Sequence, residues 1–222
     1  MKISTGSQVL NTFLNGGYEN DILTTIYGPS GSGKTNLCLL AAVKIAEQGK
    51  KVLLIDTEGG IAVDRVQQLT NTPQEVLKNL LFFNPVNFDE QKAIFETLRD
   101  LVNEEVGLII VDSISMLYRL EMGKSDEVYE VNSALGKQIS YLVEIARRRK
   151  IPVLITNQVY SDFDKRGFVK MVGGDFLKYG SKCLIELCRT EDERKLVLRK
   201  HRSLPEGKEL LFKIISKGIE EI

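Results

Sequence analysis

The sequence predicts an α/β fold built on a mostly parallel, doubly wound sheet, with an antiparallel extension at its carboxyl-terminal end. Three observations lead to this prediction. A glycine-rich phosphate loop stands between an apolar run and a helical pattern. Further apolar runs follow, each preceded by a helix-like segment. Beyond residue 182 the helices give way to short runs separated by turns.

The expected strands of the parallel part are short runs of apolar residues without polar alternation. They span residues 22–27, 51–56, 107–112 and 151–156. Because helices cover a parallel sheet on both faces, its strands are apolar throughout. Helical spacing is found over 36–48, 89–103 and 126–149. We therefore expect ligands at the carboxyl ends of the parallel strands.

The carboxyl-terminal extension is expected to contain three short strands. They span 183–188, 195–201 and 210–215, with turns at 191–193 and 205–207. At 222 residues and 43% hydrophobic composition, the chain is long enough for one well-buried domain and short for two. We predict a single domain over residues 1–222.

Composition narrows the class of protein. Thirty basic and thirty acidic residues give zero formal net charge, so contact with nucleic acid requires a local basic patch. There is no signal peptide and no run of about 18 apolar residues, so we expect a cytoplasmic protein without a membrane span. Cys38, Cys183 and Cys188 are expected to be buried thiols, not metal ligands or a disulfide.

The phosphate loop is the most specific motif in the chain. Its residues are Gly28, Pro29, Ser30, Gly31, Ser32, Gly33, Lys34 and Thr35, and Asn36 directly after it is included among the nucleotide-binding candidates. Glycines let backbone N–H groups crowd round phosphate oxygens. Lys34 supplies a cation for the β and γ phosphates, and the Thr35 hydroxyl can ligate Mg²⁺. The pattern predicts a site for ATP and Mg²⁺.

Three polar residues follow the ends of other predicted strands. Asp112 is expected to reach the metal, although many strands end in Asp merely to begin a turn. Glu58 could polarise the water that attacks the γ phosphate, or could cap the next helix. Gln158 could sense the γ phosphate through its amide, although amides are common at strand ends.

Together these motifs resemble the ATPase core of the RecA/RadA/Rad51 recombinases, and most closely the archaeal RadB paralogue family. The resemblance covers nearly the whole chain. It begins at 3–7 and 14–17, continues through the phosphate loop, 56–59, 112–113 and 157–159, and closes at 204–207 and 217–220. It implies a RecA-like P-loop NTPase core, without the amino-terminal helix-hairpin-helix domain of RadA and Rad51.

The resemblance assigns roles to particular residues. It makes Glu58 the catalytic carboxylate, Gln158 the γ-phosphate sensor, and Arg65 the arginine that stacks on adenine. It also implies two DNA-binding loops, over about 116–125 and 160–172. Candidate DNA contacts in these loops are Tyr118, Arg119, Lys165, Arg166 and Lys170, with Phe163 and Phe168 interleaved. Polar loops of this length are also ordinary surface connections.

Two departures limit the resemblance. No phenylalanine of the chain has the Phe-x-x-Ala spacing that tethers recombinase subunits, so long filaments are not expected. Where RadA-like proteins carry an acidic ATP cap, this chain has Lys200 and Arg202. These cations could reach a neighbour's γ phosphate as a trans finger, hold DNA phosphates, or form a solvated hairpin edge.

The leading functional hypothesis is an ATP- and DNA-binding accessory protein of homologous recombination with weak ATP hydrolysis and no strand exchange of its own. The resemblance implies single-stranded or branched DNA, a RadA-like recombinase and a Holliday-junction resolvase as partners, and a homodimer is considered. One alternative is a KaiC-like or helicase-like ring ATPase that uses Lys200 and Arg202. Another is an interaction module with structural ATP. A small-molecule kinase fits the motifs at 56–59 and 157–159 less well.

Overall fold

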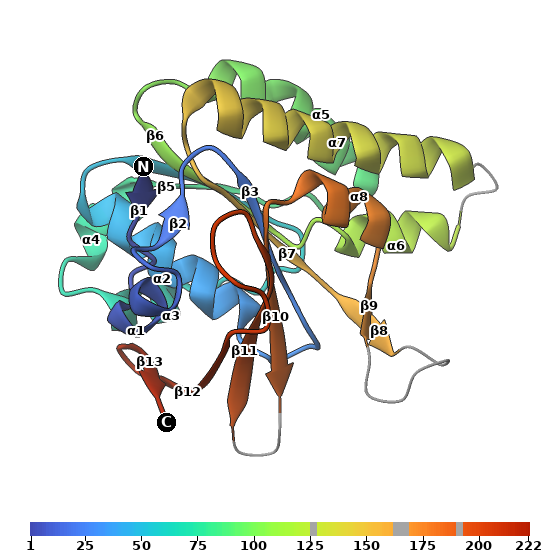
Figure 1. Cartoon of the computed structure of the whole chain (residues 1–222). Coiled ribbons are helices and arrows are strands. Elements are labelled where there is room, and N and C mark those ends of the chain that lie inside the picture. Colours follow the sequence, from blue (N-terminus) through green and yellow to red (C-terminus); the bar gives the residue numbers. More distant parts are fainter. Residues whose placement is uncertain (125–127, 162–168, 190–192) are drawn as a thin grey trace.

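The computed structural model describes residues 1–124, 128–161, 169–189 and 193–222. Within them, a nine-stranded sheet runs through the molecule in the order β13-β12-β11-β10-β3-β7-β6-β4-β5 (Figure 1). Its strands are β3 (Leu23–Tyr27), β4 (Lys51–Asp56), β5 (Leu80–Phe83), β6 (Val106–Asp112), β7 (Val153–Asn157), β10 (Cys183–Arg189), β11 (Arg194–His201), β12 (Glu209–Ile215) and β13 (Gly218–Glu221). The strands from β10 to β5 are parallel, and β11 to β13 are antiparallel.

Helices cover both faces of this sheet. The helices are α1 (Gln8–Phe13), α2 (Lys34–Glu47), α3 (Val63–Leu69), α4 (Pro73–Lys78), α5 (Phe88–Leu101), α6 (Met116–Met122), α7 (Val128–Arg149) and α8 (Gly174–Gly180). Two small two-stranded sheets accompany them. One pairs β1 (Lys2–Ile3) with β2 (Tyr18–Glu19), and the other is the hairpin of β8 (Val159–Ser161) with β9 (Val169–Met171). Side chains of α1, α2 and α4 pack on one face of the sheet, and side chains of α5 to α8 pack on the other.

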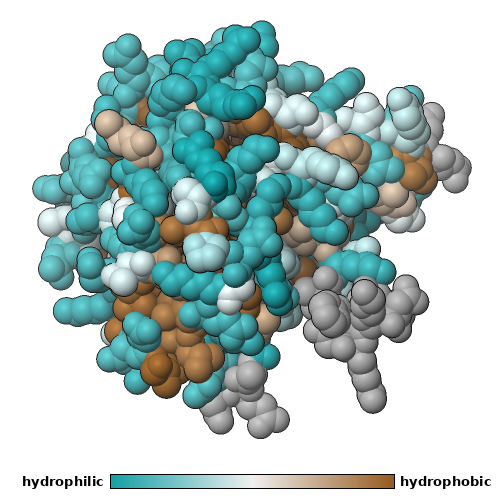
Figure 2. All heavy atoms as spheres, in the orientation of Figure 1, coloured by the Kyte–Doolittle hydropathy of each residue, from teal (hydrophilic) through white to brown (hydrophobic). Residues whose placement is uncertain are grey.

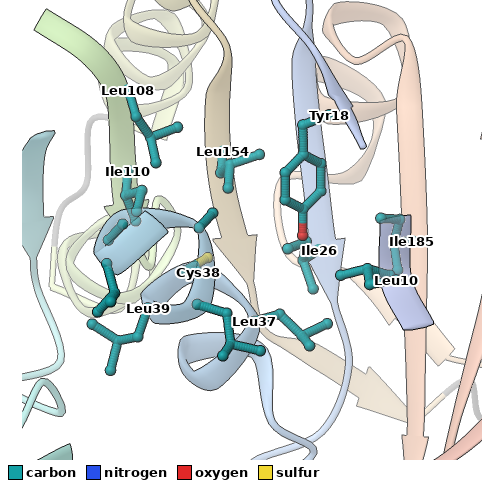
Figure 3. Packing of buried hydrophobic residues seen from close by; sticks show 14 of the residues in the cluster. Leu10, Tyr18, Ile26, Leu37, Cys38, Leu39, Leu108, Ile110, Leu154 and Ile185 are labelled. Atoms are coloured by element: carbon teal, nitrogen blue, oxygen red, sulfur yellow. The ribbon is translucent and has the colours of Figure 1, made fainter. Parts of the chain in front are cut away.

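The alternation of side chains along each parallel strand divides the hydrophobic core into two layers. Ile110 of β6 faces the layer that contains α2, whereas its neighbours Ile109 and Val111 face the layer that contains α7. Figure 3 shows Leu37 and Cys38 in the first of these layers. Because both faces are covered, the strands are apolar throughout, which is the pattern that the sequence displays.

The predicted α/β class and the doubly wound arrangement are confirmed, and the remaining differences are local. The strand expected at 151–156 begins at Val153 and ends at Asn157. The strand expected at 183–188 was assigned to the antiparallel extension, yet β10 pairs with β3 in parallel, so the antiparallel part begins one strand later, at β11. The start of the helix expected at 126 and most of the turn at 191–193 lie outside the described residues.

Much of the surface seen in Figure 2 is hydrophilic, and an apolar area lies near the carboxyl terminus. Exposed apolar side chains in and directly after the last two strands are Leu211, Ile215 and Ile222. In the part of the chain that the structure describes, every helix is too short or too polar to cross a lipid bilayer.

Candidate nucleotide-binding site

The phosphate loop joins the carboxyl end of β3 to the first residue of α2. Gly31 and Gly33 adopt positive φ angles of 71° and 104°, which side chains other than glycine rarely tolerate. A Cβ on Gly33 would also lie 3.0 Å from Cδ1 of Ile214. No side chain caps the first turn of α2, so the positive end of this 14-residue helix is available to an anion.

Lys34 folds back over its own loop. Its Nζ donates to the carbonyl oxygens of Gly28 at 3.0 Å and Pro29 at 2.9 Å. The side chain is buried, and this burial lowers the pKa of Lys34, while the nearby Glu58 and Asp112 carboxylates act in the opposite direction. The ammonium group is therefore positioned at the loop, where an incoming phosphate can replace carbonyl acceptors.

Asp112, the last residue of β6, connects the phosphate loop to the neighbouring strand β7. Its Oδ2 accepts a hydrogen bond of 2.6 Å from the Thr35 hydroxyl, and its Oδ1 accepts one from the Thr156 hydroxyl. The carboxyl group is 1% exposed, and its burial raises the pKa of Asp112. Thr35 and Asp112, the two predicted metal residues, are thus in direct contact.

Glu58 and Gln158 also come together, although 100 residues separate them in the chain. The Gln158 amide nitrogen donates to Oε1 of Glu58 at 2.9 Å. Their strands, β4 and β7, lie on either side of β6, so this bond crosses in front of the strand that ends at Asp112. The carboxylate and the amide therefore face the same edge of the sheet as the phosphate loop.

Asp56 organises the loop that carries Glu58, a role that the sequence analysis missed. Its Oδ1 accepts hydrogen bonds from the backbone N–H groups of Glu58 at 3.1 Å, Gly59 at 2.8 Å and Gly60 at 3.4 Å. Its Oδ2 accepts a hydrogen bond from the N–H of Ile61 at 3.1 Å. Asp side chains often accept hydrogen bonds from backbone N–H groups about two residues further on, and an Asp at the end of a strand with Gly59 and Gly60 shortly after it could have identified this role.

The residues present fit a nucleotide with a metal ion. The hydroxyl of Ser32 is fully buried inside the loop and has no hydrogen-bond partner in the described part of the chain. A buried hydroxyl without a partner is unfavourable, and a phosphate oxygen would satisfy it. The hydroxyl–carboxylate pair of Thr35 and Asp112 supplies the oxygen ligands that Mg²⁺ prefers.

Asn36 and Arg65 are placed together beside the loop. Oδ1 of Asn36 accepts hydrogen bonds from Nε of Arg65 at 2.9 Å and from one terminal nitrogen at 2.7 Å. Arg65 is half-buried, and this burial lowers the pKa of its guanidinium group. The structure therefore holds Arg65 against the first turn of α2, next to the phosphate loop.

The first expected DNA loop is largely helical, which corrects the prediction for 116–125. Residues Met116–Met122 form α6, because the apolar Leu117 and Tyr118 pack into the layer that contains α7. The Tyr118 hydroxyl donates to Asn132 at 2.7 Å and its ring is 7% exposed, so it offers no free face for a base. Arg119 remains exposed.

The second expected DNA loop is described only at its ends. Lys165 and Arg166, with Phe163 and Phe168, lie outside the described residues. Lys170 is exposed on β9, where it pairs with Tyr160 of β8. The hairpin of β8 and β9 begins directly after Gln158, and the Val172 N–H donates to the Gln158 carbonyl at 3.2 Å.

The structure corrects the interpretation of Arg202 as a free trans finger or DNA contact. Its guanidinium donates to both carboxylate oxygens of Asp21, at 3.0 and 2.7 Å, and its Nε lies 2.6 Å from a carboxylate oxygen of Glu19. Lys200 donates to the carbonyl of Lys178 at 2.6 Å. Arg202 directly follows the last residue of β11.

Comparisons with known proteins agree with this geometry. The family model described as Rad51 matches residues 1–222. A "DNA repair and recombination protein RadB" of Methanococcus maripaludis is 43% identical over 216 residues, covering 96% of this chain and 98% of that protein. The protein of the same name from Methanobrevibacter smithii is 42% identical over 226 residues, covering 98% and 95%.

A solved structure is similar as well. "Crystal structure of the RadB recombinase" superposes with a TM-score of 0.82 at 36% identity, covering 99% of each chain. The phosphate loop and the nine-stranded sheet define a RecA-like P-loop protein. The chain belongs to the Rad51 family. The resemblance to RadB proteins is confirmed, whereas the roles of individual site residues stay predictions.

Proposed function

We propose that this chain is an ATP- and DNA-binding accessory protein of DNA repair by homologous recombination, organised as one RecA-like domain over residues 1–222. It assists or regulates the main recombinase, hydrolyses ATP weakly and performs no strand exchange of its own. The observation that carries the proposal is the hydrogen bond between Glu58 and Gln158 in front of the phosphate loop. This bond supports the proposal because it joins the proposed water-activating carboxylate to an amide that leads into a candidate DNA-binding hairpin.

Each residue has a distinct part in the proposed chemistry. Lys34 and the loop amides bind the phosphates, while Thr35 and Asp112 would hold Mg²⁺. The bound ion supplies positive charge that neutralises the phosphate oxygens. Glu58 orients the attacking water, and we expect hydrolysis to be slow.

The proposed output of the site is DNA binding. The Gln158 amide can donate either to Glu58 or to a γ phosphate, so binding of ATP would weaken the hydrogen bond between Gln158 and Glu58. Gln158 directly precedes β8, so a movement of this residue reaches the hairpin. The backbone bond from Val172 to Gln158 ties the other end of the hairpin to the same residue. The hairpin is therefore anchored on both sides at the proposed sensor, which favours control of DNA affinity by the nucleotide.

The test of the catalytic assignment is Glu58→Gln, with Glu75→Gln as the control on an exposed acid of α4. Glu58→Gln should bind ATP as tightly as the unmodified protein and hydrolyse it roughly 10²-fold or more slowly. Glu75→Gln should leave both quantities unchanged. Equal hydrolysis by all three proteins would reject Glu58 as the water-activating group.

The test of the DNA output measures binding of a labelled single-stranded oligonucleotide with and without Mg-ATP, at low and moderate salt. Affinity should rise with ATP and fall with salt, because phosphate contacts release counterions. Gln158→Ala should keep the salt dependence and lose the response to ATP. An oligonucleotide that fails to bind at low salt in either nucleotide state would remove DNA from the proposed function.

The accessory role is tested in strand exchange by a RadA-like recombinase. We expect no exchange by this chain alone, and a changed rate or extent when it is added to the recombinase. Direct binding to that recombinase, to a Holliday-junction resolvase and to a second copy of this chain is measured by analytical ultracentrifugation. An unchanged exchange reaction, together with no binding to the recombinase, would contradict the accessory role.

A further inference from the structure

We infer that Asn36 and the backbone turn after β12 are positioning groups that hold the guanidinium plane of Arg65 as a platform for the nucleotide base. The inference rests on the proposed nucleotide site, including the adenine-stacking role that the family resemblance gives Arg65, and extends it to the groups that hold this side chain in place. It also assigns the carboxyl-terminal strands a part in nucleotide binding within the same chain.

All five N–H groups of the Arg65 guanidinium have acceptors. Nε and one terminal nitrogen donate to Oδ1 of Asn36, at 2.9 and 2.7 Å. That terminal nitrogen also donates to the carbonyl of Ile215 at 3.0 Å. The other terminal nitrogen donates to the carbonyl of Ser216 at 2.7 Å and to Oε1 of Gln68 at 2.8 Å.

This arrangement fixes the plane of the group and leaves its faces for a ligand. Guanidinium N–H bonds lie in the plane of the group, so acceptors that occupy all five directions surround its edge. A planar base can then interact only with a face, by stacking. Because all these acceptors belong to the same chain, they preorganise the platform, and little side-chain freedom is lost on binding. An ammonium group could not reproduce this geometry.

Asn36 connects the base platform to the phosphate site. It follows Thr35 in the first turn of α2 and is 9% exposed. Its amide oxygen serves two Arg65 donors, and its amide nitrogen is buried without a partner in the described residues. A ligand group that accepts a hydrogen bond would satisfy this nitrogen. The base platform and the Mg²⁺ site are therefore held by successive residues of one helix.

The carboxyl-terminal strands close the same region. The carbonyls of Ile215 and Ser216, at the end of β12 and in the following turn, hold Arg65 across 150 and 151 residues of sequence. The Ile214 side chain lies next to Gly33 of the phosphate loop. A nucleotide that stacks on Arg65 should thus stabilise β12 and β13, whereas a phosphate chain without a base should not.

The experiment compares the affinities of Mg-ATP and Mg-tripolyphosphate, the same phosphate chain without nucleoside, for four variants. Arg65→Lys keeps the charge and loses the plane. Asn36→Leu has a similar volume without the acceptor, Asn36→Gln keeps the amide, and Gln68→Ala removes an exposed acceptor. We expect Arg65→Lys and Asn36→Leu to lower the affinity for Mg-ATP about 5- to 30-fold and the affinity for Mg-tripolyphosphate less than about twofold. Asn36→Gln should lose less affinity for Mg-ATP than Asn36→Leu does, and Gln68→Ala should lower this affinity about twofold.

Hydrogen exchange provides a second measurement, which would show no difference between the two ligands if Arg65 served only to stabilise the fold. In the unmodified protein, ATP should slow exchange in β12 and β13 more than tripolyphosphate does, and Arg65→Lys should remove the difference. Equal losses for both ligands in Asn36→Leu, or no loss for ATP in any variant, would overturn the inference while leaving the phosphate site intact. If the unmodified protein binds neither ligand, the proposed function itself fails.

Discussion

At the scale of single residues, buried polar groups carry the site, and both carboxylate oxygens of Asp112 have a donor. The Asp112 carboxyl group is 1% exposed and would be unfavourable there without donors. The hydroxyls of Thr35 and Thr156 supply one donor to each of its oxygens. Thr156 thus supports a predicted metal ligand, a role that no motif in the sequence indicates, because threonine is an ordinary strand residue.

Replacing Thr156 with valine should therefore destabilise the protein although the shape of the side chain is preserved. The change leaves one oxygen of a buried carboxyl group without a donor, which costs about 1–3 kcal/mol. Chemical denaturation measures the loss. Thr97→Val is the control, because the Thr97 hydroxyl is exposed and bonds only within its own helix, so its effect should be within about 0.5 kcal/mol. Equal effects of the two changes would show that Asp112 does not depend on Thr156.

The single histidine of the chain gives a pH prediction. Burial lowers the pKa of His201 from 6.5, and its Nδ1 accepts the Ser203 N–H at 3.1 Å, which requires an unprotonated nitrogen. The unfolded chain then binds more protons than the folded protein below about pH 6.5, so stability decreases as the pH falls. As the pH falls from 7.5 to 5.5, the urea midpoint of unfolding should decline less in His201→Gln than in the unmodified protein. Parallel pH profiles of the two proteins would exclude this contribution.

At the scale of helices and strands, the sequence predicted the parts of the fold that have a strong hydrophobic pattern. The runs that became β4 and β6 are continuous and apolar, and their ends were placed within one residue. The edge strands β5 and β13 were not predicted, because four residues carry too little pattern. The sequence predicts a loop over about 116–125, whereas Met116–Met122 form a helix that is defined by the tertiary packing of Leu117 and Tyr118.

Close approach of backbones between elements gives a prediction at this scale. Gly6 has a φ of 80°, and a Cβ there would lie 2.0 Å from the carbonyl oxygen of Leu40 in α2. Gly6→Ala should therefore cost more than about 2 kcal/mol, because the backbone conformation and the contact are both unfavourable. Gly60→Ala is the matched control, because Gly60 has no positive φ and a Cβ added there would have no neighbouring atom within 4 Å. Similar unfolding midpoints for the two variants would contradict a tight junction at Gly6.

At the scale of the whole molecule, the site depends on contacts between segments that are distant in sequence. The phosphate loop could be predicted because its eight residues are contiguous. The positions of Glu58 and Gln158 after parallel strands predict that both lie at one sheet edge, whereas the hydrogen bond between them is a finding of the structure. The ion pairs of Arg202 with Glu19 and Asp21 could not be predicted, because spacing along β11 does not indicate which distant carboxylates approach it.

A site assembled from the whole molecule should stabilise the whole molecule when it binds a ligand. At 100 times the dissociation constant, Mg-ATP contributes about 2.7 kcal/mol, which corresponds to a rise in melting temperature of about 5–10 °C for a chain of this size. Scanning fluorimetry or calorimetry at increasing concentrations of Mg-ATP measures this rise in melting temperature. Lys34→Ala should show little of this rise, whatever its own melting temperature. A rise of the same size in both proteins would place ATP somewhere other than the phosphate loop.

The contact of Arg65 with Ser216 also bears on how the protein is made. These residues are 151 positions apart, and Ser216 lies only a few residues before the end of the described chain. Arg65 therefore gains its full set of acceptors only after the segment up to Ser216 has left the ribosome. The proposed base platform cannot form on a nascent chain that is shorter than this, whereas the phosphate loop is complete much earlier in synthesis.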